Sequence, residues 1–187
     1  MKIEEIAEKI ASCAKCRLAE NRKNPVPGEG DENADLLFVG EGPGRQEDLQ
    51  GKPFVGRAGG KLDDILESVS ISREDVFITN VVKCRPPENR NPRSDEVNAC
   101  SDYLEAQIAA LNPKIIVTLG NASTKFLLDT DRGITKIRGD FYDWRGSIKI
   151  FPMFHPSYLL RNPSKKRGSP KFKTWKDIKK IKKELKK

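Results

Sequence analysis

The sequence lacks the features of a membrane protein, a secreted protein and a disulfide-rich protein. No apolar run approaches the roughly 18 residues that a membrane helix needs. The N-terminus carries acidic residues where a signal peptide would have an apolar stretch. Four cysteines in 187 residues are too few for a disulfide scaffold, and spaced cysteines in such a chain more often bind metal. We therefore expect a cytoplasmic protein with no membrane partner.

Three common catalytic or nucleotide-binding motifs are also missing. The glycine-rich segment 40–48 is not followed by the Gly-Lys-Ser or Gly-Lys-Thr of a Walker A loop, and Pro43 interrupts any dinucleotide-binding pattern. The single histidine, His155, has no accompanying Gly-x-Ser-x-Gly elbow, so a hydrolase triad is not indicated. Segment 40–48 is then either a tight structural turn or a loop whose backbone N–H groups approach a ligand.

The positive charge is concentrated at one end of the chain. Residues 164–187 hold 12 lysines and arginines against 2 acidic residues, whereas the rest of the chain is close to neutral. Trp175, Ile178, Ile181 and Leu185 recur at helical spacing in this segment, so one side of a helix there can dock on the protein. We expect one domain over residues 1–187 with this basic segment packed on it or extending from it. The segment either contacts nucleic acid or is a solvated helix face.

Apolar runs and helical patterns alternate along the chain. The apolar runs are rich in β-branched residues, as buried strands are, and amphipathic patterns separate them. This alternation predicts an α/β fold with a parallel sheet covered on both faces. The four predicted strands are 35–39, 76–82, 114–119 and 147–154.

The least ordinary residues follow these strands. Glycine-rich segment 40–44 follows the first, residues 83–87 follow the second, Gly120 follows the third and His155 follows the fourth, while Asn80 ends the second. Ligands of open α/β sheets bind outside the carboxyl ends of the strands. The sequence therefore predicts a single pocket at that edge.

The four cysteines are spaced as metal ligands often are. Cys13 and Cys16 form a Cys-x-x-Cys pair, which can present two thiolates to one metal group, and Cys84 and Cys100 can complete four ligands. Spacing does not separate zinc from an iron–sulfur cluster. The alternative is that Cys84 and Cys100 are ordinary buried cysteines.

Taken together, these segments resemble the type 4 uracil-DNA glycosylases, the iron–sulfur branch of the uracil-DNA glycosylase superfamily. The resemblance implies a three-layer α/β/α sandwich with a central four-stranded parallel sheet, and a 4Fe–4S cluster on Cys13, Cys16, Cys84 and Cys100. It also implies base excision repair, in which the bond between uracil and deoxyribose is hydrolysed to leave an abasic site. The segments that carry the resemblance are 13–16, 40–48, 51–59, 78–87, Cys100 and 151–161.

The resemblance assigns roles that the chemistry of the side chains supports. Phe54 would stack on the flipped base, and Asn80 would donate to uracil O4 and accept from N3–H, a pattern that rejects cytosine. His155 would donate to uracil O2 as negative charge collects on the leaving ring, for which a neutral imidazole suffices. Without the motif, Phe54 would be assigned to core packing and Asn80 to a buried amide that pairs with backbone.

Two carboxylates are candidates for the sugar side of the reaction. Glu41 and Glu47 would stabilise the cationic sugar and orient water, and we favour Glu41. Backbone N–H groups from Gly40 to Gly42 would contact the uracil edge. The best-known branch of the superfamily has an aspartate where this chain has Gly42, and the branch that traps DNA covalently has a basic insertion that is absent after segment 57–61.

The substrate implied is uracil-containing DNA, single- or double-stranded, bound by a monomer. A turn at 157–161 resembles the family's wedge, with apolar residues that enter the gap left by the base. The alternative function is a non-catalytic iron–sulfur DNA-binding module of the same fold, which would not need Glu41, Phe54, Asn80 and His155. The predicted DNA-contacting residues are Arg85, Arg90, Arg93, Ser157, Tyr158, Leu159, Arg161, Lys165, Lys166 and Arg167.

Overall fold

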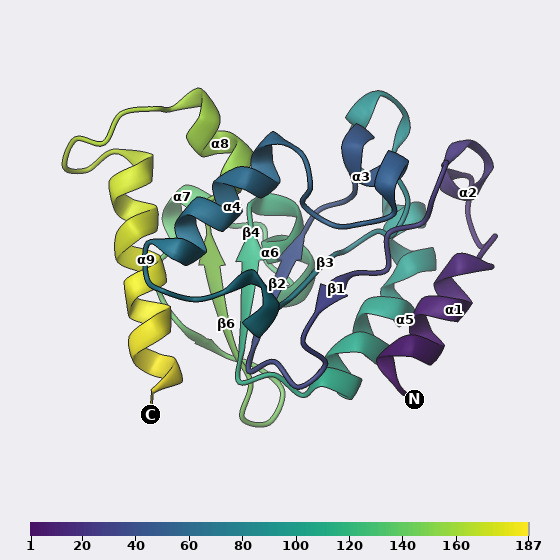
Figure 1. Cartoon of the computed structure of the whole chain (residues 1–187), viewed down its shortest axis with the longest axis horizontal. Helices are drawn as coiled ribbons and strands as arrows, with labels where there is room; N and C mark the ends of the chain where they lie inside the picture. The colour runs from purple at the N-terminus through teal and green to yellow at the C-terminus, as the bar shows by residue number, and fades with distance from the viewer. Residues whose placement is uncertain (187) are drawn as a thin grey trace.

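A computed structural model describes residues 1–186 and folds them around one twisted sheet (Figure 1). The strands lie in the order β1-β3-β2-β4-β6-β5, and β3, β2, β4 and β6 are mutually parallel. The expected central four-stranded parallel sheet is thus confirmed. The strands are β1 (Glu29–Gly30), β2 (Leu36–Gly40), β3 (Phe77–Asn80), β4 (Ile115–Leu119), β5 (Tyr142–Asp143) and β6 (Lys149–Met153).

The two edge strands are not predictable from the sequence pattern. β1 and β5 are two residues long and antiparallel to β3 and β6, respectively. Two residues are too few to produce a hydrophobic alternation, and the residues of β1 are exposed. Short antiparallel strands at both margins are a common way to protect a sheet from pairing with another chain.

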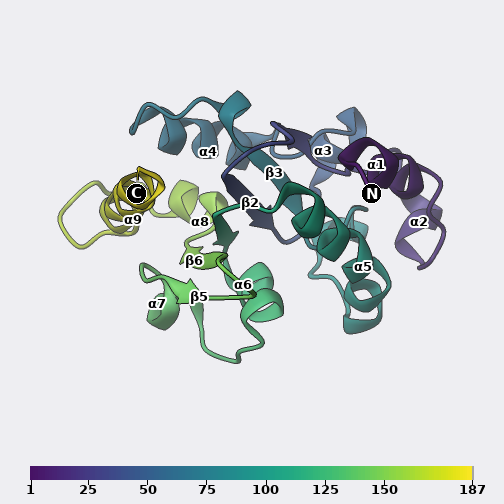
Figure 2. The same ribbon diagram turned by 90° about the horizontal axis from the view of Figure 1, so that it is seen from below.

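Helices cover both faces of the sheet, which confirms the three-layer sandwich (Figure 2). Helices α4, α7, α8 and α9 contribute to the core on one face, and α1, α5 and α6 to the core on the other. The helices are α1 (Ile3–Ala11), α2 (Leu18–Asn21), α3 (Arg45–Gln50), α4 (Arg57–Glu67), α5 (Ser94–Leu111), α6 (Asn121–Leu128), α7 (Ile134–Ile137), α8 (Pro156–Arg161) and α9 (Pro170–Leu185), with 3₁₀ turns η1 (Arg73–Asp75) and η2 (Pro87–Asn89).

Side-chain alternation in the strands explains the two cores. Leu36 and Phe38 of β2 pack on the α4 side, whereas Leu37 and Val39 pack on the α5 side. Every residue of β2 and of β4 is buried, because both faces of these strands are covered. None of the helices within residues 1–186 is long and apolar enough to span a bilayer.

The basic C-terminal segment forms α9, which packs on α4, α8 and β6. Ile178 and Ile181 are fully buried, and Leu185 packs partly against the same core. The prediction that Trp175 belongs to the docked side is wrong, since the residue is 42% exposed. Its ring faces outward, where the ammonium of Lys179 lies over it. Thr174 takes the buried position instead, because it lies four residues before Ile178 and directly above it on the helix.

The four parallel strands deliver their carboxyl ends to one edge of the sheet, at the top of Figure 1. Residues after β2 lead into α3, residues after β4 lead into α6, and residues after β6 lead into α8. After β3 the chain turns back along the edge toward η2 and α5. These four connections form the site described next.

Candidate active site

One pocket of about 810 Å³ opens at the carboxyl edge of the sheet. Its volume lies in the range of small-molecule sites. Residues after β2, β3, β4 and β6 all contribute to its wall, so the predicted convergence at this edge is what the structure contains. The predicted site residues that line it are Glu41, Gly42, Glu47, Phe54, Asn80 and His155.

Asn80 is the last residue of β3, and its side chain is turned into the pocket wall. The residue is 2% exposed, and no hydrogen bond within residues 1–186 reaches its amide, whose polar atoms are open to the pocket. Polar atoms in a pocket wall that are not paired within the chain are available to a ligand. This side chain therefore offers one donor and one acceptor, side by side, to a planar polar ligand.

Phe54 is held in a strained conformation beside Asn80. Its φ is +50°, a region that bulky residues avoid, and its ring is 7% exposed at the pocket wall. Two glycines make this arrangement possible. A Cβ on Gly59 would lie 1.8 Å from the carbonyl oxygen of Phe54, and one on Gly40 would lie 2.4 Å from Asn80 Oδ1 and 2.8 Å from the Phe54 ring.

Gly40 thus lies behind the two ligand-facing groups rather than in the pocket lining itself, which includes its neighbour Gly42. Gly59 is a residue whose purpose sequence reasoning missed, since a glycine in the first turn of a helix has no obvious local reason. Its sole sequence signal is the cost of glycine in a helix.

The two predicted carboxylates differ in what they contact. Glu47 accepts hydrogen bonds from the backbone N–H groups of Gly44, Val55 and Gly56 at 3.1, 3.0 and 2.9 Å. It therefore joins the start of α3 to the loop that carries Phe54. The carboxylate of Glu41 has no hydrogen-bond partner within residues 1–186, and partial burial raises its pKa. Glu41 is the carboxylate left available to a ligand.

His155 is the N-cap of α8, and this position fixes its tautomer. Its Nδ1 accepts from the backbone N–H of Ser157 at 3.1 Å and lies 2.8 Å from the Ser157 hydroxyl. The ring hydrogen is consequently on Nε2. Burial, and then the charge of Arg161, lower the pKa of His155 to about 4, although Glu47 acts in the opposite direction. At neutral pH the pocket contains a neutral imidazole that donates from Nε2.

Gly120 is a second glycine whose role the sequence does not predict, and it lines the pocket. It has a φ of +90°, and a Cβ there would lie 3.1 Å from Cβ of His155. Glycine after β4 therefore lets the chain enter α6 while it leaves room for the imidazole.

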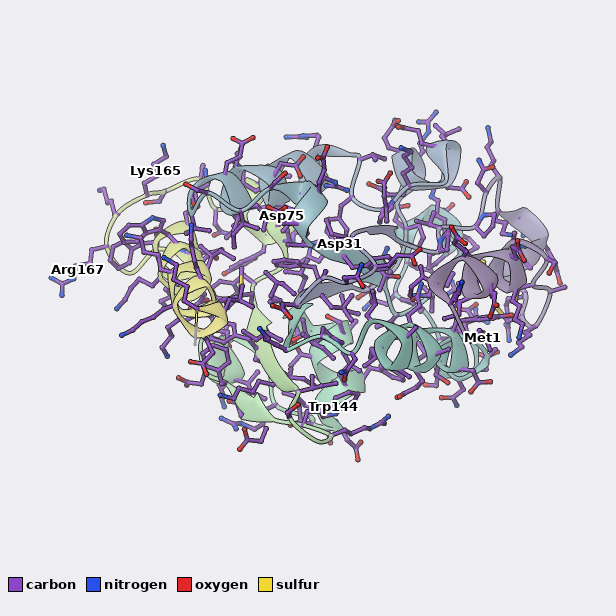
Figure 3. The ribbon with its side chains drawn as sticks, turned by 60° about the horizontal axis from the view of Figure 1, so that its bottom comes forward. Met1, Asp31, Asp75, Trp144, Lys165 and Arg167 are labelled. Carbon is purple, nitrogen blue, oxygen red and sulfur yellow. The ribbon has the colours of Figure 1, made fainter. Side chains whose placement is uncertain are left out.

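Six of the predicted DNA-contacting residues form two groups near the pocket and in the next loop. Ser157, Tyr158 and Arg161 line the pocket, and Lys165, Lys166 and Arg167 are exposed in the loop between α8 and α9. Figure 3 shows Lys165 and Arg167 extending outward from that loop at the margin of the molecule.

Leu159 requires a correction. It is 1% exposed and belongs to the core on the α4 side of the sheet, so it is not available to enter DNA. Helical geometry explains this, because α8 packs on α4 and a packed turn of helix must bury part of its surface. Tyr158 and Leu160 are the partly exposed neighbours.

Arg90 also differs from the other predicted phosphate contacts. Its guanidinium donates two hydrogen bonds, of 2.8 and 2.6 Å, to the fully buried carboxylate of Glu96. These bonds hold the pKa of Glu96 at about 2. The pair anchors η2 to the start of α5, so Arg90 is already occupied, whereas the Arg93 side chain is exposed and Arg85 donates to Asn89 at 2.7 Å.

The four cysteines line a second and much smaller cavity of about 10 Å³. All four thiols are free, and Ile10 and Tyr103 complete much of the wall. Cys13 and Cys16 lie between α1 and α2, Cys84 follows β3, and Cys100 lies on α5. Segments that are distant in the sequence therefore bring four sulfur atoms to one enclosed space.

Hydrogen bonds to two of these sulfurs suit anionic ligands. Arg22 Nη1 lies 3.1 Å from Cys84 Sγ, and the backbone N–H of Lys83 lies 3.3 Å from Cys100 Sγ. Burial raises the pKa of the Cys84 thiol and raises that of Cys100 to about 11, which a bound metal would reverse. No three His, Cys, Asp or Glu side chains of residues 1–186 are gathered closely enough to ligate a single ion. A group with several metal atoms, such as an iron–sulfur cluster held by four thiolates, fits this donor set better than one ion.

Comparison with known proteins identifies related sequences across most of the chain. A sequence model of the Uracil DNA glycosylase superfamily matches residues 27–179. The type-4 uracil-DNA glycosylase of Thermotoga maritima is 51% identical over 163 residues, which cover 87% of this chain and 85% of that protein. The type-4 uracil-DNA glycosylase of Saccharolobus solfataricus is 50% identical over 84% of this chain and 77% of that protein.

A third relative is of a different kind. A DNA polymerase of Bacillus phage SP01 is 40% identical over 78% of this chain, but the match covers only 16% of the polymerase. The similarity is thus to one region of a much longer protein.

Proposed function

The chain belongs to the uracil-DNA glycosylase superfamily, and we propose that its sheet-edge pocket binds uracil and hydrolyses the bond between uracil N1 and deoxyribose C1′ in DNA. The observation that carries this proposal is the amide of Asn80, which faces the pocket without a hydrogen bond in the described chain and lies next to the Phe54 ring. Uracil is flat and presents an acceptor beside a donor. It would satisfy the amide while it lies against the aromatic ring.

Recognition would exclude the commonest competitor. The Asn80 amide N–H₂ donates to uracil O4 and its oxygen accepts from N3–H, whereas cytosine presents a donor and an acceptor in the opposite order. A pocket built to hydrogen-bond one edge rejects an analogue that leaves buried polar groups unpaired. A base in the duplex stack must first be flipped out to reach this depth, and the half-exposed Tyr158 beside the pocket is placed to occupy the gap.

His155 and Glu41 would act on the two sides of the bond that breaks. As the bond lengthens, negative charge collects on the uracil ring and positive charge on the sugar. The neutral imidazole donates from Nε2 to uracil O2 and stabilises the leaving anion. The carboxylate of Glu41 stabilises the sugar and orients the water that adds to C1′. Glu47 would act mainly by holding the Phe54 loop, through its three backbone hydrogen bonds.

The four cysteines would hold a 4Fe–4S cluster, as the type-4 relatives and the enclosed set of four sulfurs suggest. When bound, such a cluster supplies a covalent link between the α1–α2 connection, the end of β3 and α5. This chain's own residues, Arg22 and the backbone of Lys83, stabilise the thiolates by hydrogen bonds. The cluster would lie outside the pocket lining, so it would not touch the bound base.

The substrate sets the remaining features of the proposal. The enzyme would act as a monomer on uracil-containing DNA inside the cell, with Arg161, Lys165, Lys166 and Arg167 near the phosphates. Residues 1–187 would form one domain whose basic C-terminal segment, docked through α9, presents its lysines outward.

Base release from an oligonucleotide that contains one uracil tests the proposal. Alkali should cleave the treated strand at the uracil position alone, and a matched strand with thymine there should stay intact. Absence of cleavage by folded protein with its cysteine-bound metal in place would contradict the proposal. That outcome would favour the non-catalytic DNA-binding module, for which the unpartnered groups of the pocket have no use.

A further inference from the structure

Lys83 lies at the wall of the cysteine cavity, three residues after Asn80. The residue is 1% exposed, and its Nζ donates to three oxygens, which are the Asn80 carbonyl at 2.6 Å, Thr79 Oγ1 at 2.7 Å and Gln107 Oε1 at 2.7 Å. Three acceptors match the three hydrogens of an ammonium group.

The same residue reaches the cysteine cavity through its backbone. The N–H of Lys83 donates to Cys100 Sγ at 3.3 Å, and its carbonyl oxygen accepts from the N–H of Val26 at 2.7 Å. On the other side, Thr79 and Gln107 both donate to the carbonyl of Pro27, at 2.8 and 2.7 Å. The Lys83 side chain thus connects the end of β3 to α5 and to the segment before β1.

The direction of the Asn80 amide depends on its backbone. The side chain makes no hydrogen bond within residues 1–186, so neighbouring side chains do not orient it through polar contacts. Its backbone is the terminal residue of β3, where pairing with β2 ends at Gly40. Lys83 therefore donates to the backbone carbonyl of the residue whose backbone position sets the direction of the amide.

We propose that Lys83 is a positioning residue that holds the uracil-reading amide of Asn80 in place and couples it mechanically to the cysteine cavity. This inference rests on the proposed function, because it assigns Asn80 to the base. It predicts that loss of the Lys83 amine damages excision through Asn80, and not through a general loss of stability. Substitution of groups that orient a functional residue typically costs 10- to 100-fold in activity.

A double-mutant cycle tests the proposal on the cluster-loaded protein. Lys83→Met should lower the single-turnover rate of uracil release by about 10- to 100-fold in the otherwise native protein. In an Asn80→Ala background the same substitution should lower the remaining rate by less than about twofold, because the group through which Lys83 acts is gone. Lys114→Met is the matched control, since Lys114 is an exposed lysine at the amino end of β4 that pairs with Asp35.

Equal fold-losses in the two backgrounds would overturn the proposal and leave Lys83 a stability residue. If Lys83→Met fails to fold, Gln107→Leu replaces it in the cycle, because it removes one acceptor of Nζ and touches neither Asn80 nor a cysteine. Iron content per chain should stay within the range of the control.

The side-chain amide signals of Asn80 in an ¹⁵N NMR spectrum give a readout that does not depend on catalysis. They should shift or split in Lys83→Met and stay fixed in Lys114→Met. Unchanged signals would overturn the proposal even if excision falls. If the unsubstituted protein releases no uracil, the proposed function fails, and these signals alone decide whether Lys83 positions the Asn80 amide.

Discussion

The pocket at the sheet edge and the cysteine cavity are built in opposite ways. The pocket, of about 810 Å³, contains polar groups without partners in the described chain, such as the Asn80 amide and the Glu41 carboxylate. The cavity, of about 10 Å³, is nearly filled by protein atoms, and hydrogen bonds from Arg22 and Lys83 already reach its sulfurs. Unsatisfied groups suit a ligand that comes and goes, whereas supported sulfurs suit a permanent one.

The two regions should differ in whether a substitution affects activity or stability. Removal of pocket groups that bind nothing within the described chain, such as the Glu41 carboxylate, should cost activity and leave folding nearly unchanged. Substitutions in the cysteine cavity should cost folding free energy, because a bound metal group contributes to folding directly.

The largest expected effect is on stability at the cysteine cavity. Cys16→Ala should lower the iron content and reduce the free energy of unfolding by about 4 kcal/mol, equivalent to about 10 °C in melting temperature for a chain of this size. Iron analysis and calorimetry on the same preparation measure both. A variant that keeps its melting temperature after losing iron would show that the cavity does not support the fold.

His155→Ala should produce the largest loss of activity. Removal of a donor aimed at developing negative charge lowers the rate by about 10²- to 10³-fold. The dissociation constant for uracil-containing DNA and the iron content should stay close to those of the unsubstituted protein. If the rate and the affinity for DNA fell by the same factor, the proposed role of His155 in the reaction would be wrong.

The same histidine should influence stability as a function of pH. Its pKa is about 4 in the folded chain and about 6.5 when unfolded, so between these values the unfolded chain binds a proton that the folded chain does not. The free energy of unfolding should therefore fall by about 3 kcal/mol as pH is lowered from 6.5 to 4, and this contribution should be absent in His155→Ala. Denaturant melts of both proteins across this range measure the difference. Parallel curves would contradict the assigned burial of the imidazole.

The smallest effect on folding should separate the two carboxylates. Glu47→Gln should destabilise the protein by about 1–2 kcal/mol, since its oxygens accept three backbone N–H groups and an amide supplies fewer acceptors. Glu41→Gln should leave the melting temperature unchanged and lower the rate of base release. Single-turnover kinetics and thermal melts of the two variants test this assignment, which the reverse outcome would contradict.

The parts of the fold that sequence predicted share a physical cause. Strands buried on both faces, such as β2 and β4, need continuous apolar runs, and parallel strands must bring their carboxyl ends together. That rule predicts from the sequence alone that Asn80 and His155 meet at one pocket.

The number and spacing of the cysteines are also visible in the sequence. The hydrogen bonds to them from Arg22 and Lys83 are not, because they join residues 62 and 17 positions apart.

Other properties of the site depend on contacts between segments that are distant in the sequence. The bonds of Glu47 to Val55 and Gly56 depend on how a loop folds back. Nothing in the sequence marks Glu96 as the buried partner of Arg90. The motif predicts the turn at 157–161 but not which side of α8 faces the core, which is why the prediction for Leu159 is wrong.

The most direct test concerns Asn80, on which the proposed recognition of uracil rests. Single-turnover rates should be measured on matched oligonucleotides with uracil or cytosine at one position, for the unsubstituted protein and for Asn80→Asp. The unsubstituted protein should release uracil and no detectable cytosine. An ionised aspartate accepts but does not donate, so uracil release should fall by about 10²-fold or more and the uracil-to-cytosine ratio should collapse. An unchanged ratio would contradict the account and place base recognition elsewhere in the pocket.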